Sequence, residues 1–172
     1  SVIDFNQPKK LKLGQAYGSI VSYIPVGKRF NIIPQLYAGV VFAKDAYYYG
    51  DRPIYYYLAI FIGGGQMQGR HFYQELPFVG INKVEYAYNN VAILRLDIRY
   101  NVFDKFYLTA MSNYLHDADE IRNFFKAEHT DNIWGFGLQS GYDSAIGPVS
   151  LDLHWASHTK KVGAYLNIGY YF

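Results

Sequence analysis

Cysteine is absent from this 172-residue chain, which excludes disulfides, a thiolate nucleophile and cysteine-ligated zinc. A strong charge imbalance is also missing, because 16 Lys and Arg against 14 Asp and Glu leave a formal net charge of +2. The basic residues are scattered rather than clustered. So small and dispersed an excess predicts no nucleic-acid partner.

The chain has no long apolar run. A transmembrane helix needs about 20 consecutive apolar residues, and the longest run, in YYYLAIFIGGG from Tyr55, is about half that length and ends in three glycines. No membrane-spanning helix is therefore predicted. The first residues, SVIDFNQPKK, lack a basic and then apolar leader, so we expect a secretory signal to be absent or already removed.

Aromatic residues and period-two alternation are what the chain does contain. It has 19 Tyr and 12 Phe. In NNVAILRLDIRYNVF, alternate residues from Ala92 to Val102 are apolar, and those between them, Ile93 to Asn101, are largely charged. The same split recurs at 30–42, 134–143, 149–156 and 164–172. Each segment predicts a β-strand with one apolar face and one face rich in charge and glycine.

Two all-β folds have such strands. A soluble β-sandwich packs its apolar faces inward, whereas a membrane barrel turns them to lipid. Three features favour the barrel: strands of about ten residues or more, aromatic residues near strand ends, and short connections alternating with long ones. We therefore predict an antiparallel transmembrane β-barrel. Its lipid face is expected to include Leu94, Leu96, Ile98, Leu151, Leu153, Leu166 and Ile168.

The strand count leaves two alternatives open. Seven strands are predicted, at 11–24, 29–43, 91–103, 106–114, 133–145, 148–156 and 162–172. Short turns would face the periplasm, and the long loops at 44–90, 115–132 and 157–161 would lie outside. Because a single-chain barrel has an even number of strands, either residues 54–64 form an eighth strand or the chain is the C-terminal half of a larger, 16-stranded barrel. The domain prediction is a segment at 1–10 followed by a barrel at 11–172 with its long loop at 44–90.

From about residue 55 onward the succession of segments resembles a known superfamily. The resemblance is carried, in order, by YLAIFIGGGQ, LPFVGINKVEY, NNVAILRLDIRYNVFDKFYLTA, YDSAIGPVSLDL and AYLNIGYYF. They are similar to the C-terminal barrel region of the superfamily of outer-membrane insertases and two-partner secretion pores, and most similar to barrels that follow patatin-like phospholipases. This implies a bacterial outer-membrane barrel that acts as a membrane anchor or translocation barrel, with further strands supplied by the same protein or by a second copy.

The same resemblance implies a long loop that folds inward. Its start is matched by Phe61, Gly63 and Gly64, and its tip by Val79, Gly80 and Ile81. In much of the family the tip reads Val-Arg-Gly-Phe, whereas no arginine precedes Gly80 here. The family's salt bridge between loop tip and barrel wall is therefore not expected, and active gating is placed in doubt.

The charged strand faces predict a polar network inside the barrel. Its members are Arg95, Asp97, Arg99, Gln139, Asp143, Asp152 and His154. One interpretation is a lumen that guides a charged passenger, or an acid–base pair. We favour a structural network, because charges in a barrel interior must be paired or hydrated.

Catalysis by this chain is not expected. The nearest match to a Gly-x-Ser-x-Gly nucleophile elbow is GLQSG, which has the wrong spacing. Asp152, His154 and Ser157 lie close in sequence, which leaves a small outer-membrane lipid hydrolase, similar to lipid A deacylases, as an alternative. A closed eight-stranded structural or adhesive barrel is another. The five histidines form no ligand-spaced cluster, so neither a metal nor a cofactor is expected.

The last strand carries an assembly signal by the same resemblance. Its residues are Ala164, Leu166, Ile168, Tyr170 and Phe172. An insertase that folds outer-membrane barrels recognises a terminal aromatic residue preceded by apolar residues at alternate positions. The expected partners are therefore this assembly insertase during biogenesis and membrane lipids afterwards.

Deletion of Phe172 tests this signal. We expect the truncated chain to reach the outer membrane of cells at much lower levels, while the protein already folded in detergent loses only about 1–3 kcal/mol of unfolding free energy. Membrane fractionation and denaturant titration measure the two effects. Normal outer-membrane levels of the truncated chain would refute the assignment.

Overall fold

A computed structural model describes residues 12–44, 48–49, 52–53, 60–64, 75–81, 86–88, 90–118, 123–126 and 132–169. These residues form β-strands and turns without an α-helix, which confirms the predicted all-β class. In this part of the chain no helix is long and apolar enough to cross a membrane.

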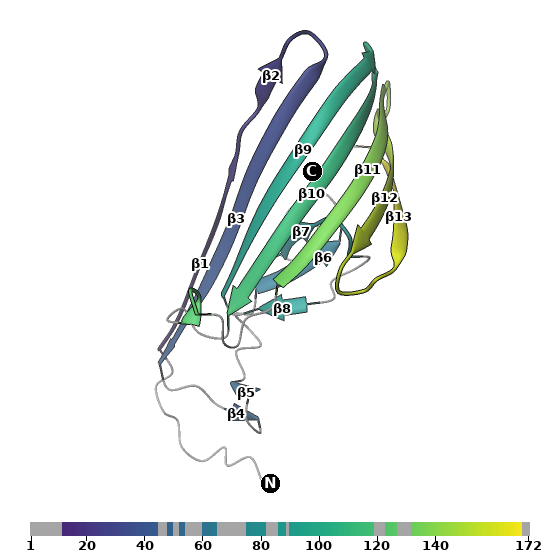
Figure 1. Cartoon of the computed structure of the whole chain (residues 1–172). Helices are drawn as coiled ribbons and strands as arrows, with labels where there is room; N and C mark the ends of the chain where they lie inside the picture. Colours follow the sequence, from purple (N-terminus) through teal and green to yellow (C-terminus); the bar gives the residue numbers. More distant parts are fainter. Residues whose placement is uncertain are drawn as a thin grey trace.

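One large antiparallel sheet forms a curved wall (Figure 1). Its strands are β1 (Lys12–Val21), β2 (Ile24–Val26), β3 (Phe30–Lys44), β9 (Asn90–Phe103), β10 (Phe106–Ala118), β11 (Asn132–Ser144), β12 (Gly147–Ala156) and β13 (Val162–Ile168). The order across the wall is β1-β3-β9-β10-β11-β12-β13, and β2 pairs with β3. Neighbours in space are mostly neighbours in sequence, as in an up-and-down barrel.

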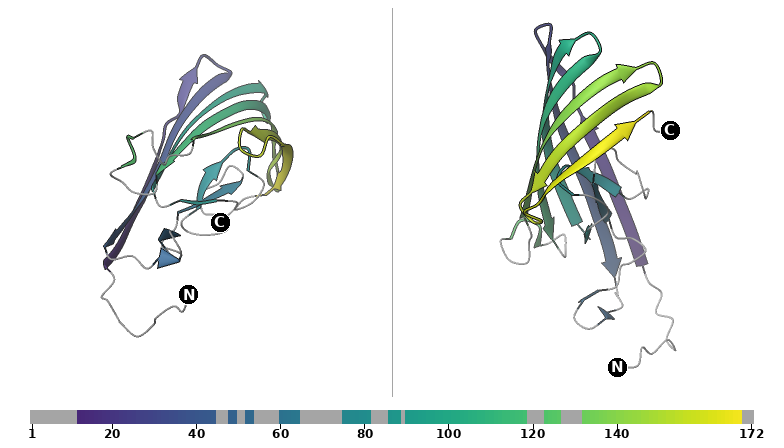
Figure 2. Two further views of the ribbon diagram at one scale, coloured as in Figure 1. Left: turned by 60° about the horizontal axis from the view of Figure 1, so that its bottom comes forward. Right: turned by 90° about the vertical axis from the view of Figure 1, so that its right-hand side faces the viewer.

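The chain between β3 and β9 contains shorter strands. These are β4 (Tyr48–Tyr49), β5 (Arg52–Pro53), β6 (Ile60–Gly64), β7 (Glu75–Phe78) and β8 (Tyr86–Tyr88). β6 pairs in parallel with β7 and antiparallel with β8. This three-stranded sheet lies in the hollow of the curved wall (Figure 2), so the β6–β8 part of the long connection lies inside the wall.

The seven predicted strands coincide with the seven long strands, with corrections to three of them. The last, predicted to run to 172, is a strand up to Ile168 and bends at Gly169, and residues 170–172 lie outside the described residues. The first predicted strand is interrupted at residues 22–23, where the Ser22 amide donates to the Pro34 carbonyl over 3.1 Å. β10 runs four residues beyond the predicted end at 114, because it stays paired with β9 up to Ala118 opposite Asn90. The Asn90 side chain also donates to the Ala118 carbonyl, over 3.1 Å.

The alternative of an eighth wall strand at 54–64 is wrong for the part that the structure describes. Ile60–Gly64 belongs to the inner sheet, and residues 54–59 lie outside the described residues. Ile62 is fully buried between the inner sheet and the wall, whereas a wall strand would alternate between lipid and interior. The wall is open, since β1 and β13 are its two edges, and a closed eight-stranded barrel does not describe it.

The two faces of the wall separate as the alternation predicts. On β9, Leu94, Leu96 and Ile98 are 56%, 41% and 44% exposed, while Arg95 and Asp97 between them are 4% and 6% exposed. The other predicted lipid-facing residues are exposed too: Leu151, Leu153, Leu166 and Ile168. A continuous apolar surface of this extent is unfavourable in water and suits a lipid environment.

Aromatic side chains mark both ends of this apolar band. At one end the rings of Tyr114 and Trp134 lie 4.5 Å apart, and at the other Phe103 and Phe106 lie 6.4 Å apart. Phe106 and Tyr114 are eight positions apart on β10, which is about 26 Å of strand, or about 20 Å across the membrane at a tilt of about 40°. That height fits an outer-membrane barrel.

The inner face divides into an apolar and a polar zone. The apolar zone packs wall residues against the inner sheet, and it comprises Tyr37, Val41, Val91, Ile93, Leu115, Ile133 and Ala156 with Ile62, Leu76, Phe78 and Ile81. The polar zone lies nearer the short turns and includes Arg95, Asp97, Thr109, Gln139 and Asp152. The inner loop thus covers the half of the face whose side chains are apolar.

Arginine at Leu153 tests the orientation of the wall. Leu153 is outward-facing and in register with Leu138 and, through it, Ala110, midway between the aromatic ends of β10. We expect Leu153→Arg to lower the unfolding free energy in lipid vesicles by about 2–4 kcal/mol. The matched control is Ile146→Arg in the exposed β11–β12 turn, with an expected cost of about 0–1 kcal/mol. Equal costs at the two positions would contradict a lipid-facing wall.

Candidate functional site

The candidate site is the contact between the loop tip, Val79-Gly80-Ile81, and the inner face of the wall. The Val79 amide donates to Asn113 Oδ1 over 2.9 Å, and Asn113 Nδ2 donates to the Val79 carbonyl over 3.0 Å. Asn113 lies on β10 and is 2% exposed. A carboxamide has a donor and an acceptor side by side, so Asn113 bonds the tip as a neighbouring strand would.

Glycines allow this close approach. A Cβ at Gly135 of β11 would collide with the Val79 carbonyl and with Asn113 Nδ2, and one at Gly137 would lie 2.6 Å from Val79 Cγ1. Any side chain at either position would push the tip away from β11. Glycine on the inner face of this strand therefore makes room for the loop.

Two features of the structure require glycine at position 80. Its φ of +116° lies in a region that other residues rarely adopt. A Cβ there would also lie 2.7 Å from the Trp155 carbonyl and 2.8 Å from Ala156 Cβ on β12. The Tyr165 hydroxyl of β13 donates to the Ile81 carbonyl, so the tip contacts four consecutive wall strands, β10 to β13.

Val79 stands where the family resemblance has an arginine, and its contacts are of a different kind. Its backbone makes both hydrogen bonds to Asn113, and its side chain points to the space above Gly137. The tip is therefore held by backbone hydrogen bonds and close packing.

The start of the loop lies beside the segment that leads to the tip. Phe61, Gly63 and Gly64 are in β6, and β6 runs parallel to β7, with Gly64 opposite Phe78. Phe78 is fully buried and directly precedes Val79. Pairing with β6 thus sets the direction in which the tip leaves the inner sheet.

The predicted polar network falls into two groups, with Asp143 at the end of β11. In the first group, Arg95 makes two 2.8 Å contacts to the Asp97 carboxylate. Gln35 of β3 also donates to Asp97, over 2.9 Å, and accepts a 2.5 Å hydrogen bond from the Tyr37 hydroxyl. A bidentate arginine–carboxylate pair with a further donor compensates for much of the cost of burying these charges.

Arg99 follows Asp97 by two positions on β9 and lies nearer the short turns. Its guanidinium is 4.3 Å from the centre of the Tyr107 ring, a cation–π geometry. The Tyr107 ring in turn covers Gly141, where a Cβ would collide with it. A third glycine of β11 is thereby matched to a large side chain on the neighbouring strand.

The second group lies on β11, β12 and β13. Gln139 and Asp152 are buried and directly opposite one another. Asn167 of β13 donates to Asp152 over 3.0 Å, and the His154 ring lies 4.6 Å from the Tyr165 ring. Asp143 is exposed at the end of β11, beside the short turn.

The sequence analysis did not single out three residues of this site: Asn113, Gln35 and Tyr165. Asn113 and Tyr165 hold the tip, and Gln35 bonds Asp97. Each is a polar residue at an inward position of an alternating strand, which is the feature that could have identified them. In the described residues, no group of three or more His, Asp or Glu side chains is placed to hold a metal.

Only part of the predicted assembly signal lies in the described residues. Ala164, Leu166 and Ile168 lie on the outward, exposed face of β13. Tyr170 and Phe172 lie outside the described residues.

Residues 39–172 match the OMP85 superfamily. The chain belongs to this superfamily. No curated protein and no solved structure matches it. The matched region runs from within β3 to the last residue, and so contains the inner loop, its tip and most of the wall of this OMP85 barrel region.

Asn113→Ala tests whether the carboxamide holds the loop tip of this OMP85 chain. Loss of both hydrogen bonds should cost about 1–3 kcal/mol and speed hydrogen exchange at the Val79 amide. The control is Ser112→Ala, at the outward-facing neighbouring position of the same strand. Unchanged protection of the Val79 amide in the Asn113 variant would show that packing alone fixes the tip.

Proposed function

We propose that this chain forms the C-terminal half of a larger, 16-stranded outer-membrane barrel and serves as the membrane anchor or translocation barrel of a patatin-like or insertase-like protein. The observation that carries the proposal is an open, lipid-compatible wall with a loop clamped to its inner face. Membership in the OMP85 superfamily supports the same class of function.

The open edges support a larger barrel. β1 and β13 lie at the two ends of the sheet, and each edge presents a row of backbone N–H and C=O groups. In hydrocarbon an unsatisfied backbone group costs several kcal/mol, so both edges need partner strands. These come from another part of the same protein or from a second copy of the chain.

The packing of the inner loop on the apolar zone of the inner face supports an anchor role, in which the loop stays in place. The tip contacts β10 to β13 through hydrogen bonds and glycine-lined packing. A translocation role would require the loop to leave the apolar zone, and the energy of that step includes re-exposing residues such as Phe78 and Leu76, which are fully buried. An anchor role requires no such movement.

We also propose that the chain has no chemistry of its own. Ser157 Oγ accepts a 3.0 Å hydrogen bond from the Trp134 amide, a structural role at the outer end of β11. His154 is 3% exposed on the inner face, and its ring lies 4.6 Å from the Tyr165 ring. A serine nucleophile needs a base within hydrogen-bond reach, and these contacts favour separate structural roles for the two residues.

Cross-linking tests how the wall closes, because the chain has no native cysteine. Cysteines on the outward face of β1, at Ala16, Gly18 or Ile20, are each combined with cysteines on β13, at Ala164, Leu166 or Ile168. We expect no cross-link within one chain for any pair. A cross-linked dimer would assign the missing strands to a second copy. A cross-link within one chain, absent in the single-cysteine controls, would indicate a barrel that this chain closes by itself and contradict the proposal.

A hydrolysis assay tests the non-enzymatic assignment. Detergent-purified protein should release no fatty acid from phospholipid or lipid A. If it does release fatty acid, and Ser157→Ala or His154→Ala abolishes the release while Ser140→Ala does not, the lipid hydrolase alternative replaces the proposed function.

A further inference from the structure

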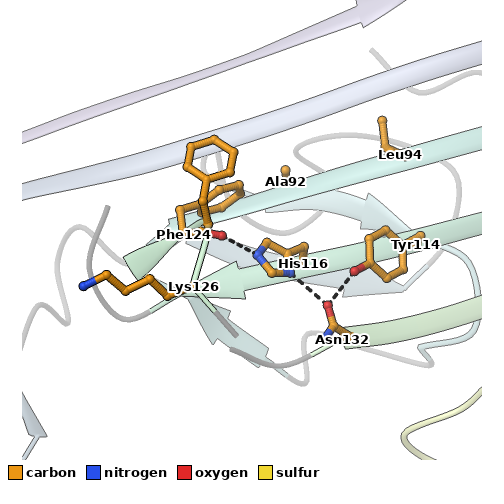
Figure 3. Close-up of a pocket in the computed structure, with 8 residues that line it drawn as sticks. Ala92, Leu94, Tyr114, His116, Phe124, Lys126 and Asn132 are labelled. Carbon is orange, nitrogen blue, oxygen red and sulfur yellow. Dashed lines mark hydrogen bonds between the residues drawn. The ribbon is translucent and has the colours of Figure 1, made fainter. Parts of the chain in front are cut away.

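A groove opens on the outward side of the wall, at the end opposite the short turns (Figure 3). It encloses about 540 Å³ between the ends of β9, β10 and β11 and the turn at residues 123–126. The residues that line it are Ala92, Leu94, Tyr114, His116, Phe124, Phe125, Lys126 and Asn132. Its floor is apolar at Ala92 and Leu94, and its polar groups gather at His116, Asn132 and Lys126.

His116 holds the turn against the wall and so forms the groove. Its Nε2 lies 2.7 Å from the Phe124 carbonyl oxygen, and its Nδ1 lies 2.8 Å from Asn132 Oδ1. The Tyr114 hydroxyl donates to the same Asn132 oxygen over 2.5 Å, and the Phe124 ring meets the His116 ring edge-on at 4.8 Å. Both ring nitrogens of His116 are thus engaged by protein oxygens, one on the turn and one on β11.

The position of the groove corresponds to the border between acyl chains and headgroups. Tyr114 and Trp134 form part of the aromatic band at this end of the wall, where such residues sit at the membrane interface. Leu94 is opposite Tyr114 and faces outward. His116 is two residues further along β10, about 7 Å beyond that band, and therefore at headgroup level.

The side chains at the groove's margin match an anionic lipid. Phe125 is 96% exposed, an unfavourable state in water and a favourable one at a lipid interface. Lys126 is the one permanently charged side chain among the described residues that line the groove. Its ammonium extends away from His116 and Asn132 at the margin of the groove (Figure 3), where it is free to meet a phosphate group.

We propose that this groove binds a phosphorylated lipid of the outer leaflet, with an acyl chain over Ala92 and Leu94 and the phosphate at Lys126. A free phosphate ion would leave the apolar floor unused. A neutral lipid would leave Lys126 unpaired. The proposal requires the lipid-facing orientation of the wall. It does not depend on whether the barrel translocates another protein or on how the barrel closes.

Lipid binding by the protein purified from membranes in mild detergent tests the proposal. After partial delipidation, native mass spectrometry measures binding of phosphatidic acid, of phosphatidylcholine with the same acyl chains, and of inorganic phosphate. We expect phosphatidic acid to bind more tightly than phosphatidylcholine, and phosphate to compete with neither. Lys126→Ala should weaken phosphatidic acid binding about fivefold, the contribution typical of one interfacial lysine.

Two variants distinguish lipid binding in the groove from a general electrostatic attraction between anionic lipid and exposed lysines. Lys161→Ala removes an exposed lysine from the β12–β13 turn at the same end of the wall, and we expect it to change phosphatidic acid binding less than twofold. Ala92→Phe fills the apolar floor and should weaken binding of both lipids. An equal effect of the two lysine variants, or unchanged binding in both groove variants, would overturn the proposal.

The amount of each variant in the membrane fraction distinguishes this inference from the proposed function. We expect Lys126→Ala and Ala92→Phe to reach the membrane at wild-type levels, since neither alters the wall pairing. Loss of lipid binding with normal membrane levels supports the groove. Normal levels with unchanged lipid binding refute the groove alone and leave the barrel proposal standing.

Discussion

Backbone hydrogen bonds across the wall are the constraint on which the rest of this structure depends, because a membrane offers no water to an unpaired amide or carbonyl. Seven long antiparallel strands satisfy one another in sequence order, and their pleat sends alternate side chains outward and inward. The outer stripe is then apolar, as at Leu96 and Ile98. The inner face has to accommodate everything else, including the charged pair Arg95 and Asp97.

The inner loop provides a second layer for the apolar half of that face. Wall residues such as Ile93 and Leu115 would otherwise face an aqueous lumen, and they pack instead on Phe78 and Ile81. The contact is close because β11 carries glycine where the tip passes, and it is specific because Asn113 bonds the backbone of Val79 in both directions. In this OMP85 chain the tip is therefore fixed by shape and backbone pairing, at a position where an arginine would have depended on charge.

Polar groups away from the loop are stabilised by neighbours on adjacent strands. Asp97 receives hydrogen bonds from Arg95 and Gln35, and Asp152 receives one from Asn167. Removing one partner of such a pair leaves an uncompensated charge in a poorly hydrated interior, which is costly. On the outward side, the polar residues His116 and Asn132 lie at the end opposite the short turns.

Local alternation by itself determined the strands and their two faces, since the side-chain period of a strand is a property of consecutive residues. The membrane class followed from strand length, the aromatic residues near strand ends and the alternation of short and long connections. The family resemblance, and not the alternation, marked Val79 to Ile81 as a loop tip. Neither identified Asn113 or Tyr165 as partners of that tip, or the extension of β10 to Ala118, because these depend on residues more than 25 positions apart in the chain. The place of Ile60–Gly64 was likewise decided by tertiary structure: a short apolar strand suits lipid and protein interior equally well, and only the burial of Ile62 between the inner sheet and the wall distinguishes the two.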